Sequence, residues 1–174
     1  MGRVCLLLLW CLVGCASVPP TAPMADHLSM DGVVRQVNHY RTANGLPPLM
    51  PQHELAVAAA EQARYQAATE TMSHTGHRGA KLEDRLWRAR YKHRLAGENV
   101  SFGRQTEQAV VEAWIRSDPH REMLLHPKVT EIGVAAALAP NGQVYWSMVM
   151  AQPFYAHRFT TQQNRNRVVL SAAR

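Results

Sequence analysis

Two apolar segments, residues 131–139 and 143–152, flank the dipeptide Asn141-Gly142 near the end of the chain. Asn-Gly between two apolar runs is the strongest short-range signal for a β-hairpin. Helical patterns fill the chain before this hairpin, so the sequence predicts an α+β fold rather than a doubly wound parallel sheet. Four large side chains alternate along the second segment and therefore face one side of a strand: Val144, Trp146, Met148 and Met150.

The helical patterns begin soon after the N-terminal region. Apolar residues recur at helical spacing from Met30 to Tyr40, and Asn44-Gly45 supplies a stop. An alanine-rich helix is predicted from about Pro51 to Thr71, with a thin profile that allows close packing. A shorter helix follows, and its apolar positions are Leu82, Leu86 and Ala89.

Two further helix starts carry recognisable signals. Thr106 can cap a helix, with Glu107 in the first turn, where the helix dipole favours negative charge. Asp118-Pro119 ends this helix and begins another turn, with Asp118 as the cap and Pro119 in the first helical position. Two tryptophans on these predicted elements are expected in the core: Trp114 and Trp146.

The chain begins with the pattern of an export signal. Residues 1–14 contain an apolar run about half as long as the roughly 20 residues that a membrane-spanning helix needs. The run ends in Leu12-Val13-Gly14-Cys15, which resembles the lipobox of bacterial lipoproteins. That resemblance implies a lipid anchor on Cys15, and Ala16 after it favours sorting to the outer membrane. An ordinary signal cleaved near Ala16-Ser17 is the alternative.

This interpretation divides the chain into a signal (1–14), a lipidated tether (15–27), one domain (28–155) and a basic tail (156–174). Two of the three cysteines leave with the signal and the third is acylated. The mature domain therefore has no disulfide, no thiolate metal ligand and no cysteine nucleophile. Any metal must then be held by histidine, carboxylate or water.

The formal net charge is +6, and it becomes +5 when Arg3 leaves with the signal. No acidic residue follows Glu131, while four arginines do: Arg158, Arg165, Arg167 and Arg174. The tail is interpreted either as a solvated segment or as a contact for peptidoglycan or anionic lipid. Nucleic acid is not an expected partner of an exported chain whose arginines are not interleaved with aromatic residues.

Three short polar segments separate the predicted helices and carry the candidate chemistry: Ser73-His74-Thr75-Gly76, Gly97-Glu98-Asn99-Val100 and residues 114–121. Each is expected in a turn, in a loop or at a helix end. Two imidazoles and a carboxylate, from His74, Glu98 and His120, would bind a divalent cation or move protons if the fold brought them into one cleft. Alternatively, each side chain serves only to cap a helix or to pin a loop.

These segments resemble, in order and spacing, the CAP superfamily, also called the SCP or cysteine-rich secretory protein, antigen 5 and pathogenesis-related-1 domain. The likeness covers about residues 28–152. Further matching pieces are Asn38-His39-Tyr40-Arg41, residues 44–49, residues 55–60, Asp84-Arg85-Leu86, residues 130–134 and Tyr145-Trp146.

The resemblance implies a three-layer α-β-α sandwich with a small antiparallel sheet and a cleft of histidines and acidic residues. It implies a divalent metal such as zinc on His74 and His120, with Glu98 and Ser117 in the same binding cleft. Many members carry a second glutamate where this chain has Ser117. A four-residue site is therefore not expected here.

Three functions follow from this pattern. The first is a non-enzymatic, outer-membrane-anchored binding module whose cleft holds a metal and a further ligand. The second is a hydrolase of peptide or peptidoglycan bonds, with Glu98 as general base beside His74 and His120. The third is a structural envelope lipoprotein with a vestigial cleft. A classical serine hydrolase is not expected, because the adjacency of Ser117, Asp118 and His120 in the chain is not triad geometry and the sequence has no Gly-x-Ser-x-Gly nucleophile elbow.

Overall fold

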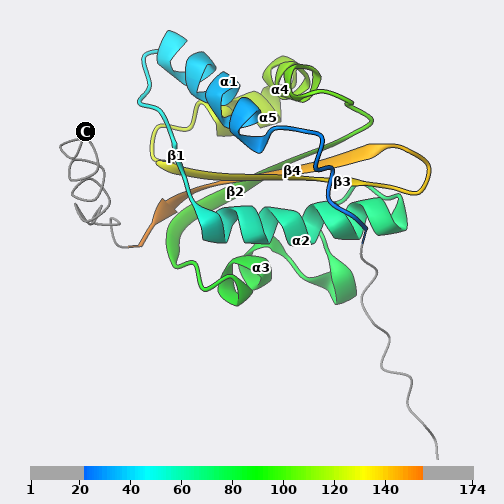
Figure 1. Ribbon diagram of the computed structural model, residues 1–174. Helices are drawn as coiled ribbons and strands as arrows, with labels where there is room; N and C mark the ends of the chain where they lie inside the picture. The colour runs from blue at the N-terminus through cyan, green and yellow to red at the C-terminus, as the bar shows by residue number, and fades with distance from the viewer. Residues whose placement is uncertain (1–21, 155–174) are drawn as a thin grey trace, which may run out of the picture.

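The computed structural model describes residues 22–154. Figure 1 shows one sheet with helices on both of its faces. The predicted signal, the proposed lipidation site at Cys15 and the basic tail 156–174 lie outside these described residues. The elements, in chain order, are α1 (Met30–Ala43), β1 (Met50–Pro51), α2 (His53–Thr69), η1 (His77–Gly79), α3 (Leu82–Arg88), β2 (His93–Phe102), α4 (Glu107–Arg116), α5 (Asp118–Leu124), β3 (Glu131–Leu138) and β4 (Val144–Pro153).

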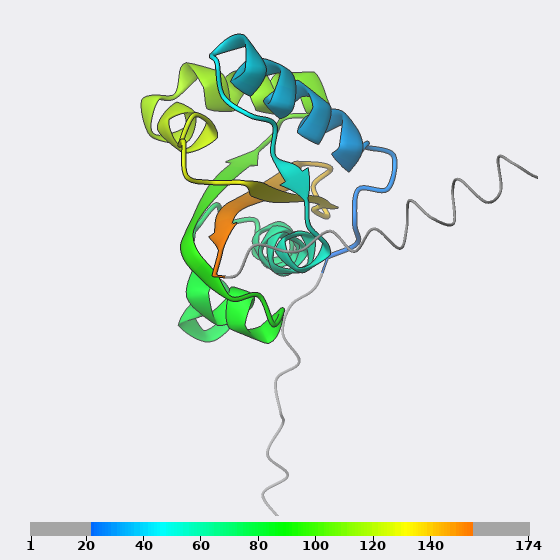
Figure 2. The same cartoon turned by 90° about the vertical axis from the view of Figure 1, so that its left-hand side faces the viewer.

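The predicted α+β fold is confirmed, and the hairpin forms where the sequence placed it. The sheet order is β1-β3-β4-β2, and β3 pairs with β4 in antiparallel register from Glu131↔Ala151 to Leu138↔Val144. The sheet is mixed rather than purely antiparallel, because the two-residue β1 runs parallel to β3. In Figures 1 and 2, α1, α4 and α5 cover one face of the sheet, and α2 and α3 cover the other.

The core has two halves, one on each face of the sheet. Trp114 and Trp146 are buried in the half beneath α1 and α4, as the sequence predicts. The other half is built from the small residues of α2, which lies very close to β3. A Cβ atom placed on Gly133 would stand only 2.1 Å from the backbone nitrogen of Ala56. The thin alanine face of α2 and the missing side chain at Gly133 together permit this approach.

The assignment of residues 97–100 to a loop was wrong. They belong to β2, an edge strand of ten residues that pairs with β4 from His93 to Phe102. Glu98 pairs with Val149 in this register, so its position is fixed by the sheet. The helix cap at α5 also differs by one residue, because α5 begins at Asp118 and Ser117 occupies the cap position.

Residues 22–25 pack on the sheet, which differs from the extended tether expected over 15–27. Ala22 and Ala25 are buried, and Met24 forms an antiparallel bridge with Ala137 of β3. The backbone N–H of Ala25 donates to Ala136, and that of Leu138 donates to Pro23. This segment therefore covers the part of the β3 edge that β1 leaves open.

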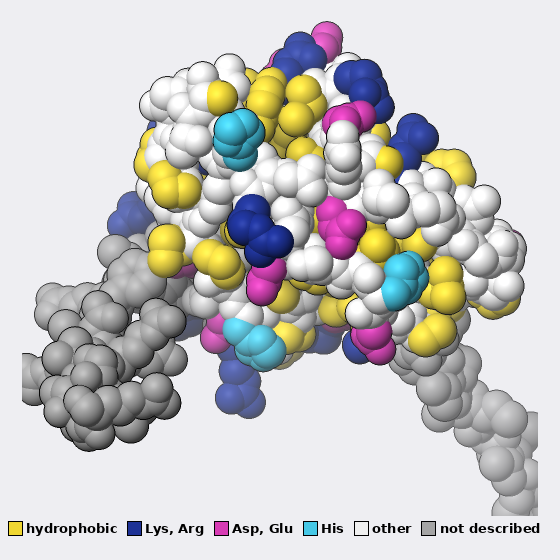
Figure 3. All heavy atoms as spheres, turned by 45° about the horizontal axis from the view of Figure 1, so that its top comes forward, with side chains coloured by type: hydrophobic (Ala, Val, Ile, Leu, Met, Phe, Trp, Pro, Cys, Tyr) yellow, Lys and Arg dark blue, Asp and Glu magenta, His cyan; other side chains and the backbone are white. Residues whose placement is uncertain are grey.

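The surface on the α1 and α4 side is chemically mixed. Figure 3 shows hydrophobic, acidic and basic side chains interspersed there, with histidines at separate places. Among residues 22–154, no helix combines the length and the apolar character needed to cross a bilayer.

Candidate functional site

Glu98 is the fixed centre of the candidate site. Its side chain is only 2% exposed, and Arg85 of α3 holds its Oε1 atom at 2.6 Å. The Ser147 hydroxyl of β4 donates to the same oxygen at 2.8 Å. Because Arg85 is itself fully buried, this ion pair is shielded from water on both sides. The carboxylate is therefore anchored by one helix and by the neighbouring strand.

His74, in the loop after α2, is the third side chain that contacts this carboxylate. Its Nδ1 lies 3.1 Å from Glu98 Oε2, while its ring is 62% exposed to solvent. The hydrogen bond to Glu98 raises the pKa of His74, and partial burial opposes that rise. One edge of the imidazole is thus oriented by a buried carboxylate, and Nε2 is the ring nitrogen that Glu98 does not engage.

The backbone of the His74 loop is held from beneath. Gln62 and Gln66 of α2 both donate their side-chain amides to the carbonyl of Ser73. Arg85 also reaches this loop, because its second guanidinium nitrogen lies 3.4 Å from the carbonyl oxygen of His74. A single buried arginine therefore contacts both the carboxylate and the loop that presents the imidazole.

His120 lies in α5, which packs against β2. The Asn99 amide of β2 donates to the carbonyl of His120 at 3.0 Å. Met123 packs over Gly97, where an added Cβ would stand 2.3 Å from the methionine sulfur. Burial lowers the pKa of His120, and the nearby charge of His74 lowers it further. The charge of His74 thus acts on His120, and the pKa values of the two imidazoles are shifted in opposite directions.

Ser117 lies between α4 and α5. Its backbone N–H donates to Trp114, and its carbonyl accepts from Arg121. Among the hydrogen bonds of residues 22–154, none joins its hydroxyl to His74, Glu98 or His120. The structure thus brings His74 and Glu98 into direct contact, places His120 near them, and gives Ser117 a structural position at the helix junction.

The same geometry limits which side chains could act as metal ligands. Within the described part of the chain, no group of three or more His, Cys, Asp or Glu side chains is placed to hold an ion. Both oxygens of Glu98 already accept hydrogen bonds or ion pairs from Arg85, Ser147 and His74. Of the three candidate side chains, only the imidazoles of His74 and His120 are therefore left as potential metal ligands, with Glu98 orienting His74.

Two residues of this site were not identified from the sequence. Arg85 stood inside a segment recognised only as a family match, and its pairing with Glu98 depends on how α3 packs against β2. Ser147 carried a weak signal, since it is a hydroxyl in a buried and otherwise apolar stretch of β4. A buried polar residue in such a strand generally has a hydrogen-bond partner.

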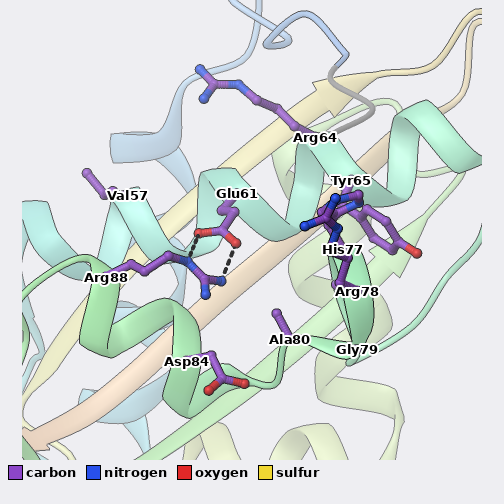
Figure 4. Close-up of a pocket in the computed structure, with 11 residues that line it drawn as sticks. Val57, Glu61, Arg64, Tyr65, His77, Arg78, Gly79, Ala80, Asp84 and Arg88 are labelled. Atoms are coloured by element: carbon purple, nitrogen blue, oxygen red, sulfur yellow. Dashed lines mark hydrogen bonds and ion pairs between the residues drawn. The ribbon is translucent and has the colours of Figure 1, made fainter. Parts of the chain in front are cut away.

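A separate hollow of about 800 Å³ lies between α2 and α3. Figure 4 shows Glu61 of α2 paired with Arg88 of α3 at its side, with Tyr65 and His77 at the other end. The rings of Tyr65 and His77 meet edge to face, with centroids 6.4 Å apart. Neither His74 nor Glu98 lines this hollow, so it is distinct from the candidate site.

Known proteins share this sequence pattern. The chain is 30% identical to the uncharacterized protein YkwD of Bacillus subtilis over 114 residues, which are 66% of this chain and 44% of that protein. It is 31% identical to the uncharacterized membrane protein YlbC of the same organism over 100 residues, 56% of this chain and 28% of that protein. The chain thus spans less than half the length of either curated relative.

Solved structures share the fold. An extracellular protein containing an SCP domain from Bacillus anthracis superposes with a TM-score of 0.64 at 24% identity, covering 71% of this chain and 40% of that one. An outer surface protein from Borrelia burgdorferi superposes with a TM-score of 0.66 at 21% identity, covering 71% and 92%. The model of the cysteine-rich secretory protein family, CAP, matches residues 34–150, and the chain belongs to that family.

Proposed function

We propose that this protein is a binding module of the cell envelope whose cleft holds a divalent metal, such as zinc, together with a further ligand. The observation that supports this most directly is the chain of contacts from Arg85 to Glu98 to His74. A histidine that binds metal usually donates its other ring nitrogen to a carboxylate, which fixes the ring and its tautomer. Glu98 is placed to do this for His74.

His74 and His120 would hold the ion through their imidazole nitrogens. Two protein ligands leave at least two positions of a tetrahedral site for water or for donor atoms of the bound ligand. Binding of metal and ligand would then be mutually dependent. Ser117 remains a proposed residue of the cleft only because it caps α5, the helix that carries His120.

The envelope location is proposed on two grounds. The segment ending in Cys15 resembles a lipobox, and two structural relatives are described as extracellular or outer-surface proteins. If Cys15 carries the anchor, only a short stretch of chain separates the anchor from the domain, because Ala22 already packs on the sheet. Seven residue steps at about 3.5 Å each give at most roughly 25 Å. The domain would then sit close to the outer membrane.

Zinc titration tests the metal site. Replacing both histidines (His74→Ala, His120→Ala) should weaken zinc binding by at least about 100-fold, because both protein ligands are lost, whereas exposed His53→Ala should change nothing. Protons compete for imidazole, and the pKa of His74 is raised. As the pH is lowered, the zinc affinity of the wild type should therefore begin to fall at a pH above about 6.5, the usual pKa of imidazole. It should keep falling as the pH decreases further. Isothermal titration calorimetry from pH 8 to pH 5 measures both effects.

Glu98→Gln separates orientation from ligation. It should weaken zinc binding by about 10- to 100-fold, the usual cost of losing the group that orients a metal-bound histidine. Equal affinity in the wild type and the double histidine variant would remove the metal site. The cleft would then be left with the structural role of a vestigial site.

A hydrolase is the second candidate, and one observation favours it. The pKa of His74 is raised and that of His120 is lowered. A pair of groups shifted apart in this way can supply a proton donor and a proton acceptor near neutral pH. Glu98 is less suited to be the general base, because Arg85, Ser147 and His74 already engage its oxygens.

Incubating the purified protein with sacculi and with casein tests this candidate. The binding function predicts no release of soluble fragments by the wild type. Release that is lost in both Glu98→Gln and His120→Ala, with their folds intact by circular dichroism, would make the hydrolase the better assignment.

A further inference from the structure

A second groove, whose lining includes none of His74, Glu98 and His120, is lined by aromatic side chains. It has a volume of about 650 Å³, and Trp87 of α3 and Phe154, the residue after β4, are among the residues that line it. Trp87 is 80% exposed and Phe154 is 44% exposed. Trp87 therefore offers an apolar ring to whatever enters the groove, and Phe154 offers the part of its ring that Arg94 does not cover. Neither residue has a part in the site around Glu98.

Several residues of this groove are held by contacts within the chain. The backbone N–H of Phe154 donates to Lys92 at 2.9 Å, and the Arg94 guanidinium lies 5.0 Å from the Phe154 ring centroid. The rings of Tyr91 and His93 stack with centroids 6.5 Å apart and planes at 14°.

The groove carries polar groups of both characters. Glu83 and Asp84 supply carboxylate acceptors, and Lys92 and His93 supply donors beside the aromatic faces. Sugars combine flat apolar C–H faces with a rim of hydroxyl groups, so they suit aromatic platforms next to mixed donors and acceptors. Lys92 adds positive charge for a ligand that also bears carboxylates.

The groove continues toward the hollow shown in Figure 4, since Asp84 lines both. Two adjoining concavities on either side of one short helix suit a polymer better than a small molecule. The groove is also at the opposite end of the sheet from Ala22. Phe154 follows the C-terminal end of β4, whereas residues 22–25 pair near the C-terminal end of β3, which runs antiparallel to β4.

This position favours one occupant over another. If the chain is anchored through Cys15, as proposed above, the end carrying Ala22 faces the bilayer and the end carrying Phe154 faces away from it. An exposed tryptophan beside basic residues would otherwise suit a lipid surface equally well. The polymer that faces such an end of an envelope protein is the cell wall.

We propose that the groove lined by Trp87 and Phe154 binds peptidoglycan, with the Trp87 ring and the exposed part of the Phe154 ring contacting amino-sugar faces and Lys92 facing its carboxylates. This binding does not use His74, Glu98 or His120. It is also separate from any contact made by the basic tail, because stacking on aromatic rings persists when salt screens charge.

Co-sedimentation of the full mature chain with purified sacculi tests the proposal, at low salt and at 1 M salt, where the Debye length is about 3 Å. Trp87→Ala and Phe154→Ala should each lower the affinity roughly tenfold or more, as loss of a central aromatic contact does. Phe102→Ala is the matched control. Phe102, at the C-terminal end of β2, is an aromatic residue about as exposed as Phe154, and its loss should leave sedimentation unchanged.

The readouts separate the alternatives. Melting temperature and zinc affinity should be the same in Trp87→Ala and in the wild type, since this side chain is largely in solvent. Wild-type affinity for sacculi in the two groove variants would overturn the proposal. The proposal would also be overturned if Trp87→Ala and Phe154→Ala lost binding to anionic phospholipid vesicles but kept their binding to sacculi. Sedimentation that disappears entirely at 1 M salt would assign the contact to charge alone and also overturn it.

Discussion

Replacing Arg85 with methionine should destabilise the domain by about 3 to 5 kcal/mol, the usual cost of leaving one partner of a buried ion pair unpaired. The Glu98 side chain is 2% exposed and would be left with only Ser147 and His74 as partners. The backbone of the His74 loop would lose a donor at the same time. Urea unfolding at pH 7, followed by circular dichroism, measures the loss.

Arg88→Met is the matched control, three residues further along α3. Its partner Glu61 and Arg88 itself are about 40% exposed, so water screens the pair and its removal should cost roughly 0 to 1 kcal/mol. Adding Glu98→Gln to Arg85→Met should recover part of the lost stability, because the unpaired charge is gone. An Arg85→Met protein as stable as Arg88→Met would contradict the central place given to this ion pair.

Gly133→Val should cost at least about 3 kcal/mol, at the upper end of what overpacking a core does, or prevent folding. The new Cβ would overlap the backbone of α2, lying 2.1 Å from Ala56 nitrogen and 2.2 Å from the Leu55 carbonyl carbon. A backbone cannot move aside as a flexible side chain can. The helix would have to separate from the sheet, although valine itself favours a strand.

Gly97→Ala provides the comparison. There the added atom meets the sulfur and methyl group of Met123, which can change rotamer. We expect a loss nearer 1 kcal/mol, with a small displacement of α5 and its His120. Thermal melting of both variants measures these losses. A Gly133→Val protein that melts within a few degrees of the wild type would show that α2 does not lie as close to β3 as described.

Sequence patterns were sufficient for elements whose signals are local. The hairpin at Asn141-Gly142 and the helix capped by Thr106 both form where turn and cap chemistry placed them, with Thr106 accepting from the N–H of Ala109. Trp114 and Trp146 are buried as expected from their apolar faces. In each case the residue's own neighbours in the chain carry the information.

The misread elements are those whose conformation depends on distant partners. β2 carries Gly97, Glu98 and Asn99, which have low strand propensity, and it is a strand because β4 pairs along its whole length. The partners of those polar side chains, Arg85 and the carbonyl of His120, come from other helices. The contact between His74 and Glu98 could be suspected only from family likeness, since 24 residues separate them.

The covered edge of β3 has a consequence for how the domain is made. Residues 22–25 are among the first of the described chain to be synthesised, yet their partners in β3 arrive near the end. Contacts so distant along the chain close late, because the entropy cost of closing the intervening loop must be offset first. A nascent domain would therefore keep an unsealed flank, open to pairing with a neighbouring chain, until almost all of it has been made.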